Sequence, residues 1–351
     1  MILRWYILRE LLAGILLAFI SLTAILFLMN LLGPMRAFAV MSLSFLARSA
    51  PAILLYTMPM TLLVGVVVGM TLGYGRLAGD NEIDAMRVSG VSLRRILAPA
   101  MAAGAAASIL AFVIYWDAVP YAGRVQRSLR DDALLEMLKS PPPGPQQFWL
   151  GSMMRMSYRE VKEGTFKDFR IVVYSSVDHG ASEIHSAREA RLVAGETAAV
   201  EMRDYRTLRF DSQGQRLPEQ TAAEGRFQLP ISGKVDDVPR PKYAGGARLL
   251  RMMNEGAFRE DAAFEFHSRV AGSLTPLVLA LMAALIGIQV RRSSRLAGLG
   301  ASLPPLFLYM ILALPLEQLA LGGSLDPRLA AYLPVGLMLT ADAALYWRMA
   351  R

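Results

Sequence analysis

Few side chains in this sequence are suited to catalysis. The chain has no cysteine, and its three histidines, His179, His185 and His267, show neither an HExxH motif nor another spacing typical of metal ligands. The GxSxG motif of serine hydrolases and the phosphate-binding loop GxxxxGK followed by Ser or Thr are also missing. We therefore expect a chain that is not an enzyme and holds no metal and no cofactor. Any ATP that drives it, with its Mg, would be bound by another protein.

Ionisable residues are grouped in one short segment, GDNEIDAMRVSGVSLRR at 79–95, which separates two apolar stretches. We expect a short helix at about 80–91. Asp80 or Asn81 is suited to cap it, with a side-chain oxygen that accepts from backbone N–H groups of the first turn.

This short helix is predicted to be amphipathic. At about 100° per residue, Met86 and Gly90 share one face with Ile83, while Glu82 lies along one edge and Arg87 lies toward the other. One interpretation is an interfacial helix that ties two membrane spans together. The other is a coupling helix that docks on a cytoplasmic ATPase and transmits its motion.

The elements that position this segment are long apolar stretches. Hydrophobic residues make up 54% of the 351 residues, and the mean hydropathy is +0.37, which is not typical of a soluble protein. Runs of the length that can cross a membrane carry no charge or only Asp342. They lie at 11–35, 51–75, 96–116, 270–290, 296–316 and 329–347.

These runs predict six membrane helices in two groups of three. The first three belong to 1–116 and the last three to 267–351, and a polar region at 117–266 lies between them. The first run is longer than the apolar core of a cleaved signal peptide, so we expect it to stay in the protein.

Arginine residues in the short flanking segments predict the orientation, because basic residues resist translocation. One side holds most of them: Arg4, Arg9, Arg76, Arg87, Arg94, Arg95, Arg291, Arg292, Arg295, Arg348 and Arg351. Only Arg36, Arg48 and Arg328 lie in the short loops opposite. Both termini and segment 79–95 are therefore predicted to be cytoplasmic, with the polar region on the other side. The net charge of +8 largely reflects this asymmetry, so nucleic acid is not an expected partner.

The polar region is predicted to be mostly β. In MMRMSYREV at 153–161, apolar and polar residues alternate as in a half-buried strand. Similar stretches follow at 169–176, 187–211 and 225–231, separated by turn residues. Repeated short strands favour a sandwich or a jelly-roll-like domain. A helical extension of the third span, at about 119–138, is expected to precede it.

Small residues in the second apolar stretch indicate close helix packing. Gly65, Gly69 and Gly73 recur at four-residue spacing, which lets another helix approach. That helix could belong to a second chain or to the same chain.

Three segments resemble the LptF/LptG family of lipopolysaccharide export permeases. They are YILRELL at 6–12, the stretch from MPMTLL to LAPAM at 58–101, and FEFHSRVAGSLTPLVLALMAALIG at 264–287. The family pattern S-E-I/L-x-x-M-x-A-x-G is matched by NEIDAMRVSG, which places its Glu at Glu82, its Met at Met86 and its Gly at Gly90. Asn81 replaces the Ser of that pattern. The start ILRELL and the sequence GSLDPRL are slightly more typical of LptF than of LptG.

The resemblance implies a mechanism and partners. Two such permeases pair around a cavity that opens to the membrane, accept lipopolysaccharide from the inner membrane and pass it to periplasmic jelly rolls. The implied partners are a second LptF/LptG-type permease, a cytoplasmic LptB-like ATPase dimer, and periplasmic LptC/LptA-like jelly-roll proteins. Glu82, Met86, Arg87 and Gly90 would then couple the chain to the ATPase.

Two arginines are candidates for binding the phosphates of that lipid. Arg36 lies at the outer end of the first span and Arg269 at the start of the fourth, and a guanidinium binds phosphate with two hydrogen bonds. For both, the alternative is an interfacial anchor.

Two other classes of function remain open from the sequence. One is an exporter of a different glycolipid built on the same frame. The other is a membrane-tethered binding or scaffold protein whose β domain holds a partner without any ATPase.

Overall fold

The computed structural model describes nearly the whole chain. The described residues are 2–37, 43–139, 141, 143–150, 154–174, 181–193, 197–211, 214–232, 241–255, 259–290 and 295–350. They form two compact units. The membrane unit comprises Met1–Gly33, Leu46–Val125 and Pro239–Arg351, and the β unit comprises Pro34–Phe45 and Gln126–Val238.

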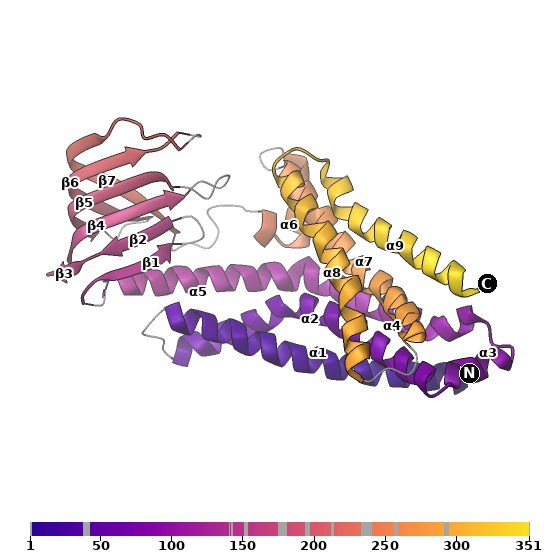
Figure 1. Cartoon of the computed structure of the whole chain (residues 1–351). Coiled ribbons are helices and arrows are strands. Elements are labelled where there is room, and N and C mark those ends of the chain that lie inside the picture. Colours follow the sequence, from indigo (N-terminus) through magenta and orange to yellow (C-terminus); the bar gives the residue numbers. More distant parts are fainter. Residues whose placement is uncertain are drawn as a thin grey trace. The chain divides into compact units, whose positions relative to one another are not determined.

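Long helices dominate the membrane unit (Figure 1). They are α1 (Ile2–Ala37), α2 (Leu43–Gly79), α4 (Leu93–Val113), α7 (Arg259–Gln289), α8 (Arg295–Leu321) and α9 (Pro327–Ala350). Within the described residues, six helical segments are long and apolar enough to cross a membrane, which confirms the predicted spans. The helices exceed the charge-free runs because their ends continue through charged residues, as α7 does from Arg259.

The third span continues beyond its apolar part as one helical rod. A π-helical turn, η1 (Ile114–Ala118), joins α4 to α5 (Val119–Lys139) without a break. Such π turns insert one extra residue in a helix and change the direction of the side chains that follow. The helical extension predicted at about 119–138 is α5.

Small residues hold α7 at the centre of the membrane unit. A Cβ atom added at Gly287 would lie 2.8 Å from the backbone oxygen of Thr71 on α2. One added at Gly104 on α4 would lie 2.8 Å from the Cβ of Ala280 on α7. Both α2 and α4 therefore pack against α7 at backbone distance, as small residues allow in membrane helices.

The glycine stripe of α2 packs against α1 of the same chain. Gly65, Gly69 and Gly73 face Phe19, Ile15 and Leu11 in turn, and a Cβ added at Gly69 would lie 2.5 Å from the backbone nitrogen of Ile15. The stripe is thus covered within the chain. Of the two alternatives that the sequence left open, the structure favours packing within one chain.

The β unit is an antiparallel sheet whose described strands follow one another in chain order. They are β1 (Gln146–Leu150), β2 (Met154–Tyr158), β3 (Glu160–Lys162), β4 (Thr165–Tyr174), β5 (Ala181–Val193), β6 (Thr197–Arg209) and β7 (Gln220–Ser232). The sheet order is β1-β2-β4-β5-β6-β7, and β3 pairs with β4. The predicted β domain is confirmed. The described strands form one sheet of sequential neighbours, whereas a two-sheet jelly roll has Greek-key crossovers.

One face of this sheet carries the core of the β unit. Phe166, Phe169 and Ile171 of β4 are buried there with Met156 of β2 and Met202 of β6. Phe166 and Phe169 are three residues apart, so a strict two-residue alternation would place them on opposite faces. A local change of backbone must therefore separate them.

That change is a crease that crosses three neighbouring strands. Asp168 on β4 and Asp204 on β6 have positive φ angles of 51° and 53°. The strand register places Arg188 of β5 in line with both. At each of the three positions the alternation of buried residues shifts by one, and the core face continues on both sides of the crease.

The chain returns to the membrane unit through two short helices, η2 (Pro241–Tyr243) and α6 (Gly246–Glu255). Leu249 and Met252 of α6 form a small buried cluster with Ala244 and with Ala262 of α7. Helix α6 is thereby packed along the start of α7.

The contact between α1 and α2 predicts opposite effects for the same substitution at two glycines. Gly69→Ala should destabilise the membrane unit by about 1–3 kcal/mol, because the added methyl meets backbone atoms of Ile15 that cannot rotate away. Gly336→Ala in α9, where a Cβ meets nothing within 4 Å, should be neutral or slightly stabilising. Unfolding of both variants in mild detergent measures this. Equal stability of the two would show that α1 does not pack on this stripe.

Candidate functional site

Segment 79–95 forms a tight helix–turn–helix connection. Helix α2 ends at Gly79, α3 spans Glu82–Val88, and α4 begins at Leu93. Asn81 precedes α3 in the left-handed conformation, with φ 59°, and its side chain makes no capping hydrogen bond. Capping by the side chain of Asn81, one of the two predicted possibilities, is therefore wrong. The turn leaves only Asp80 and Asn81 between the two helices, and the left-handed backbone at Asn81 reverses the chain there instead.

Gly90 ends α3 by its backbone conformation. It has a φ of 82°, which glycine adopts without steric cost. The N–H of Val91 donates to the carbonyl of Met86, and the N–H of Gly90 donates to the carbonyl of Arg87. This pair of hydrogen bonds is a Schellman motif, which satisfies the last carbonyls of a helix. The predicted site residue Gly90 therefore shapes the loop that follows α3.

Helix α3 has one buried face and one exposed face. Ile83 and Met86, which is 9% exposed, belong to the core of the membrane unit together with Leu93 and Ile96 of α4. On the other side, Val88 is 89% exposed. The face toward solvent therefore presents an uncovered apolar side chain next to charged residues.

Two polar contacts tie α3 to both ends of the chain. The hydroxyl of Tyr6 in α1 donates to Oε1 of Glu82 at 3.2 Å, and Nη2 of Arg87 donates to the carbonyl of Met349 in α9 at 3.1 Å. Arg94, at the start of α4, reaches the hydroxyl of Tyr346. Helix α3 therefore lies beside the first and last turns of the chain, where Figure 1 places both termini.

The predicted coupling residues thus differ in what they can contact. Glu82 and Arg87 are at least partly open to solvent, whereas Met86 holds α3 to the bundle from inside. The coupling role of all four residues stays a prediction. Sequence reasoning missed Val88, which the helical periodicity alone could have placed opposite Ile83 and Met86.

Arg269 is engaged within the protein. It is 5% exposed, and its Nε donates to Oε1 of Glu265 at 2.9 Å. Its Nη1 donates to the carbonyl of Ala244 at 2.8 Å, and its Nη2 donates to the carbonyl of Lys242 at 3.1 Å and to that of Pro241 at 3.4 Å. We call this group of contacts the Arg269 clamp. It supports the anchoring alternative, because every nitrogen of the guanidinium already has an acceptor.

Further contacts hold η2 and α6, where the chain returns from the β unit, beside η1 and α5. Nη1 of Arg124 in α5 donates to the carbonyl of Tyr243, and the ring of Tyr243 lies against Gly123. Gly246, at the start of α6, packs directly on the ring of Trp116 in η1. A side chain at Gly246 would overlap that ring. The other lipid-binding candidate, Arg36, lies near the end of α1, and its side chain falls outside the described part of the structure.

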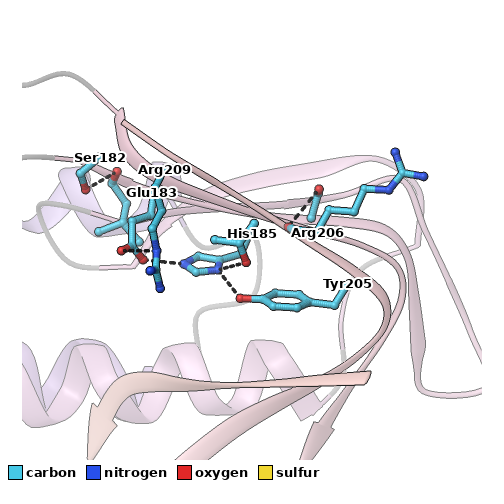
Figure 2. A network of polar contacts seen from close by, with 9 residues as sticks. Ser182, Glu183, His185, Tyr205, Arg206 and Arg209 are labelled. Atoms are coloured by element: carbon cyan, nitrogen blue, oxygen red, sulfur yellow. Dashed lines mark hydrogen bonds and ion pairs between the residues drawn. The ribbon is translucent and has the colours of Figure 1, made fainter. Parts of the chain in front are cut away.

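The β unit contains a polar network on its core face (Figure 2). His185 is 4% exposed, with its Nδ1 2.6 Å from the hydroxyl of Tyr205 and its Nε2 3.1 Å from Oε2 of Glu183. Arg209 pairs with the other oxygen of Glu183 at 3.3 Å. A neutral His185 that donates from Nε2 and accepts at Nδ1 satisfies both neighbours.

Burial lowers the pKa of His185 below its usual value, although the neighbouring Glu183 carboxylate acts in the opposite direction. From the sequence alone, His185 is only one of three histidines without metal-ligand spacing. The alternation of β5 could have placed it on the core face, two residues before the buried Ala187. Among the residues that the structure describes, no cluster of three His, Asp or Glu side chains could hold a metal ion.

The described architecture is that of a multi-pass membrane protein with an antiparallel β unit inserted between its third and fourth spans. Residues 5–348 match the family described as lipopolysaccharide export system permease LptF/LptG. The chain belongs to this family, which confirms the resemblance seen in the sequence and makes it a permease of lipopolysaccharide export in general terms. The match does not distinguish LptF from LptG. No curated protein matches the chain.

The His185 network predicts a pH dependence of β-unit stability. A buried histidine with a lowered pKa stays neutral in the folded state while the unfolded chain takes up a proton below pH of about 6.5. Stability should therefore fall as the pH drops below that value. Hydrogen exchange of β5 and β6 amides in the full chain, corrected for intrinsic rates, measures it. His185→Asn, which cannot titrate, should flatten the dependence. An unchanged slope in this variant would assign the effect to other groups.

Proposed function

We propose that this chain is the permease subunit of an ATP-driven exporter that extracts lipopolysaccharide from the bacterial inner membrane. A cytoplasmic ATPase dimer would dock on α3, and a second LptF/LptG-type permease would complete the transport cavity. The observation that carries the coupling is the placement of α3. The helix is held to the bundle by Ile83 and Met86 and turns the exposed Val88 away from it.

The contacts of α3 support a role in transmitting motion. Its buried face shares one core with α4 and α7, so a push on α3 acts on packed side chains and not on a loose loop. Its polar contacts reach α1 through Tyr6 and α9 through Met349. A docked ATPase would therefore act on four helices at once. Since the sequence has no phosphate-binding loop, hydrolysis itself belongs to the partner.

The β unit supports a handover to periplasmic jelly-roll proteins of the LptC/LptA type. In the described sheet, β1 pairs only with β2, and β7 pairs only with β6. Each of these edge strands offers free backbone groups on one side, which suits the addition of a strand from another sheet. We propose that one of these edges joins the next protein in the export path.

The proposed topology can be tested with single cysteines, because the chain has none of its own. A Leu217→Cys variant in the β unit and a Val88→Cys variant in α3 each place the cysteine at an exposed position. A maleimide that cannot cross membranes should label Leu217→Cys in intact spheroplasts but label Val88→Cys only after lysis. Labelling in the opposite order would place α3 and both termini outside the cytoplasm.

Coupling through α3 predicts a specific loss in Glu82→Arg. The half-exposed Glu82 lies at the edge of the proposed docking face. Loss of a rim-exposed ion pair with the ATPase would cost about 0–1 kcal/mol, and loss of a desolvated pair about 2–5 kcal/mol. The reversed charge adds repulsion to either value. The ATPase should co-purify less and lipid export should fall, while membrane insertion stays normal.

Two further variants make this test sharper. Asp84→Arg makes the same charge change toward the other edge of α3 and should have a smaller effect. Val88→Asp places a charge on the exposed apolar side chain and should weaken ATPase binding without changing the buried face. If Glu82→Arg and Val88→Asp both retain the ATPase and full export, α3 is only an interfacial tether.

A further inference from the structure

A cavity of about 360 Å³ lies inside the membrane unit, beside the Arg269 clamp. Its walls come from α2, the α4–α5 rod, η2, α7 and α8 of the same chain. The polar part of the lining includes Tyr56, Tyr115, Lys242, Glu265 and Tyr309. This volume is at the lower end of the range for small-molecule sites.

The cavity lies at the depth where membrane helices change from polar to apolar. In α7 the last charges before a long uncharged stretch are Glu265 and Arg269, and both line the cavity. Tyrosines from α2, η1, η2 and α8 surround it: Tyr56, Tyr115, Tyr243 and Tyr309. Tyrosine is enriched at the level of lipid headgroups, because its ring is apolar and its hydroxyl is polar. The cavity therefore faces the headgroup region.

This is the headgroup region away from α3. The start of α7 carries the cavity, whereas its last residue, Gln289, reaches the side chain of Met349, whose carbonyl binds Arg87 of α3. A helix of this length separates its two ends by the thickness of a bilayer. A ligand of the cavity would thus come from the leaflet opposite α3.

Several hydrogen-bond donors of the cavity have no partner within the described structure. This holds for the hydroxyls of Tyr56 and Tyr115 and for the ammonium group of Lys242, which has no ion pair among the described residues. Tyr309 differs, since its hydroxyl accepts from Thr275 at 3.2 Å. Tyr115 is held in place by its ring, which lies on Gly272 at 3.5 Å from the position of an added Cβ. The donors come from three different helical elements and surround the same space.

The charge of the cavity favours an anion. Glu265 is neutralised by Arg269, whose remaining donors are bound to backbone carbonyls of η2 and Ala244. Lys242 is exposed and leaves one uncompensated positive charge at the cavity. An ammonium group together with tyrosine hydroxyls is suited to a phosphate, which accepts several charge-assisted hydrogen bonds.

We propose that this cavity binds the phosphate-bearing headgroup of a membrane lipid, with Lys242, Tyr115 and Tyr56 as its donors. The site lies within one chain, so it requires neither a second permease nor an ATPase. It stands apart from the proposed coupling through α3, and failure of one leaves the other intact. The phosphate could belong to a glycerophospholipid or to a phosphorylated glycolipid, and these share the chemistry that the cavity recognises.

Lipid binding to the purified, delipidated full chain in neutral detergent tests this proposal. Native mass spectrometry would give the occupancy for phosphatidylglycerol, for a phosphorylated glucosamine lipid and for diacylglycerol with matched acyl chains. We expect one or both phosphate lipids to bind at least about tenfold more tightly than diacylglycerol. Inorganic phosphate at the same concentration should not displace them, because it lacks the acyl chains.

Matched variants separate the cavity from the rest of the surface. Lys242→Gln should weaken binding of the phosphate lipid about tenfold, and Tyr115→Phe, which removes only the hydroxyl, about fivefold. Tyr121→Phe on the exposed side of α5 and Lys162→Gln in the β unit should leave binding unchanged. Diacylglycerol that binds as tightly as the phosphate lipids would overturn the proposal. So would displacement by inorganic phosphate, or equal binding by the cavity variants and their controls.

Discussion

The hydrogen bonds of the buried Arg269 guanidinium hold the segment 241–244 against α7, where the chain comes back from the β unit. Removing an arginine from water is costly unless its charge and its N–H groups are matched. Glu265, one turn earlier on α7, supplies the charge, and carbonyls of 241–244 accept the remaining hydrogen bonds. These carbonyls belong to the point where the chain comes back from the β unit. Lysine could not replace this fork, because its ammonium presents its donors from a single atom.

Close approach of helix backbones determines how the membrane helices pack against one another. Within a membrane, helix association depends on packing, because lipid tails are as apolar as the side chains that they would replace. Gly69 allows contact between α1 and α2, Gly287 between α2 and α7, and Gly104 between α4 and α7. Each contact uses a residue without a side chain, and together they connect four helices. Gly246 has the same function at the start of α6, where it accommodates the ring of Trp116 in η1.

The sequence predicts what depends on local patterns, and it misses what depends on distant contacts. Uncharged runs predict six spans, and the periodicity of Ile83 and Met86 predicts the buried face of α3, because both follow from the solvent around one helix. The carbonyls that accept from Arg269 lie more than twenty residues away in sequence, so its anchoring role is visible only in the fold. Similarly, the glycine stripe predicts a close helix but does not identify α1 as that helix.

The crease of the β unit and the start of α3 were missed for another reason. Alternation assumes extended backbone at every residue, but Asp168 and Asp204 adopt positive φ values that shift the alternation. Asn81 also adopts a positive φ before α3, where its backbone, and not its side chain, makes the turn. Asn and Asp tolerate this conformation better than most residues, yet in the sequence they look like ordinary caps or surface residues.

Helix α3 and the Arg269 clamp both contact the core that contains α7, which bears on how an ATPase could drive the chain in the proposed function. Helix α3 shares its core with α4 and α7, and α7 runs without a break for about 30 Å from Gln289 to Arg269. Closely packed interiors deform little, so we expect a displacement of α3 to be passed on through the buried Ile83 and Met86. In the proposed coupling it would move α7, and with α7 the clamp that holds η2. A force applied at α3 by an ATPase would therefore reach the connection to the β unit through packed helices alone.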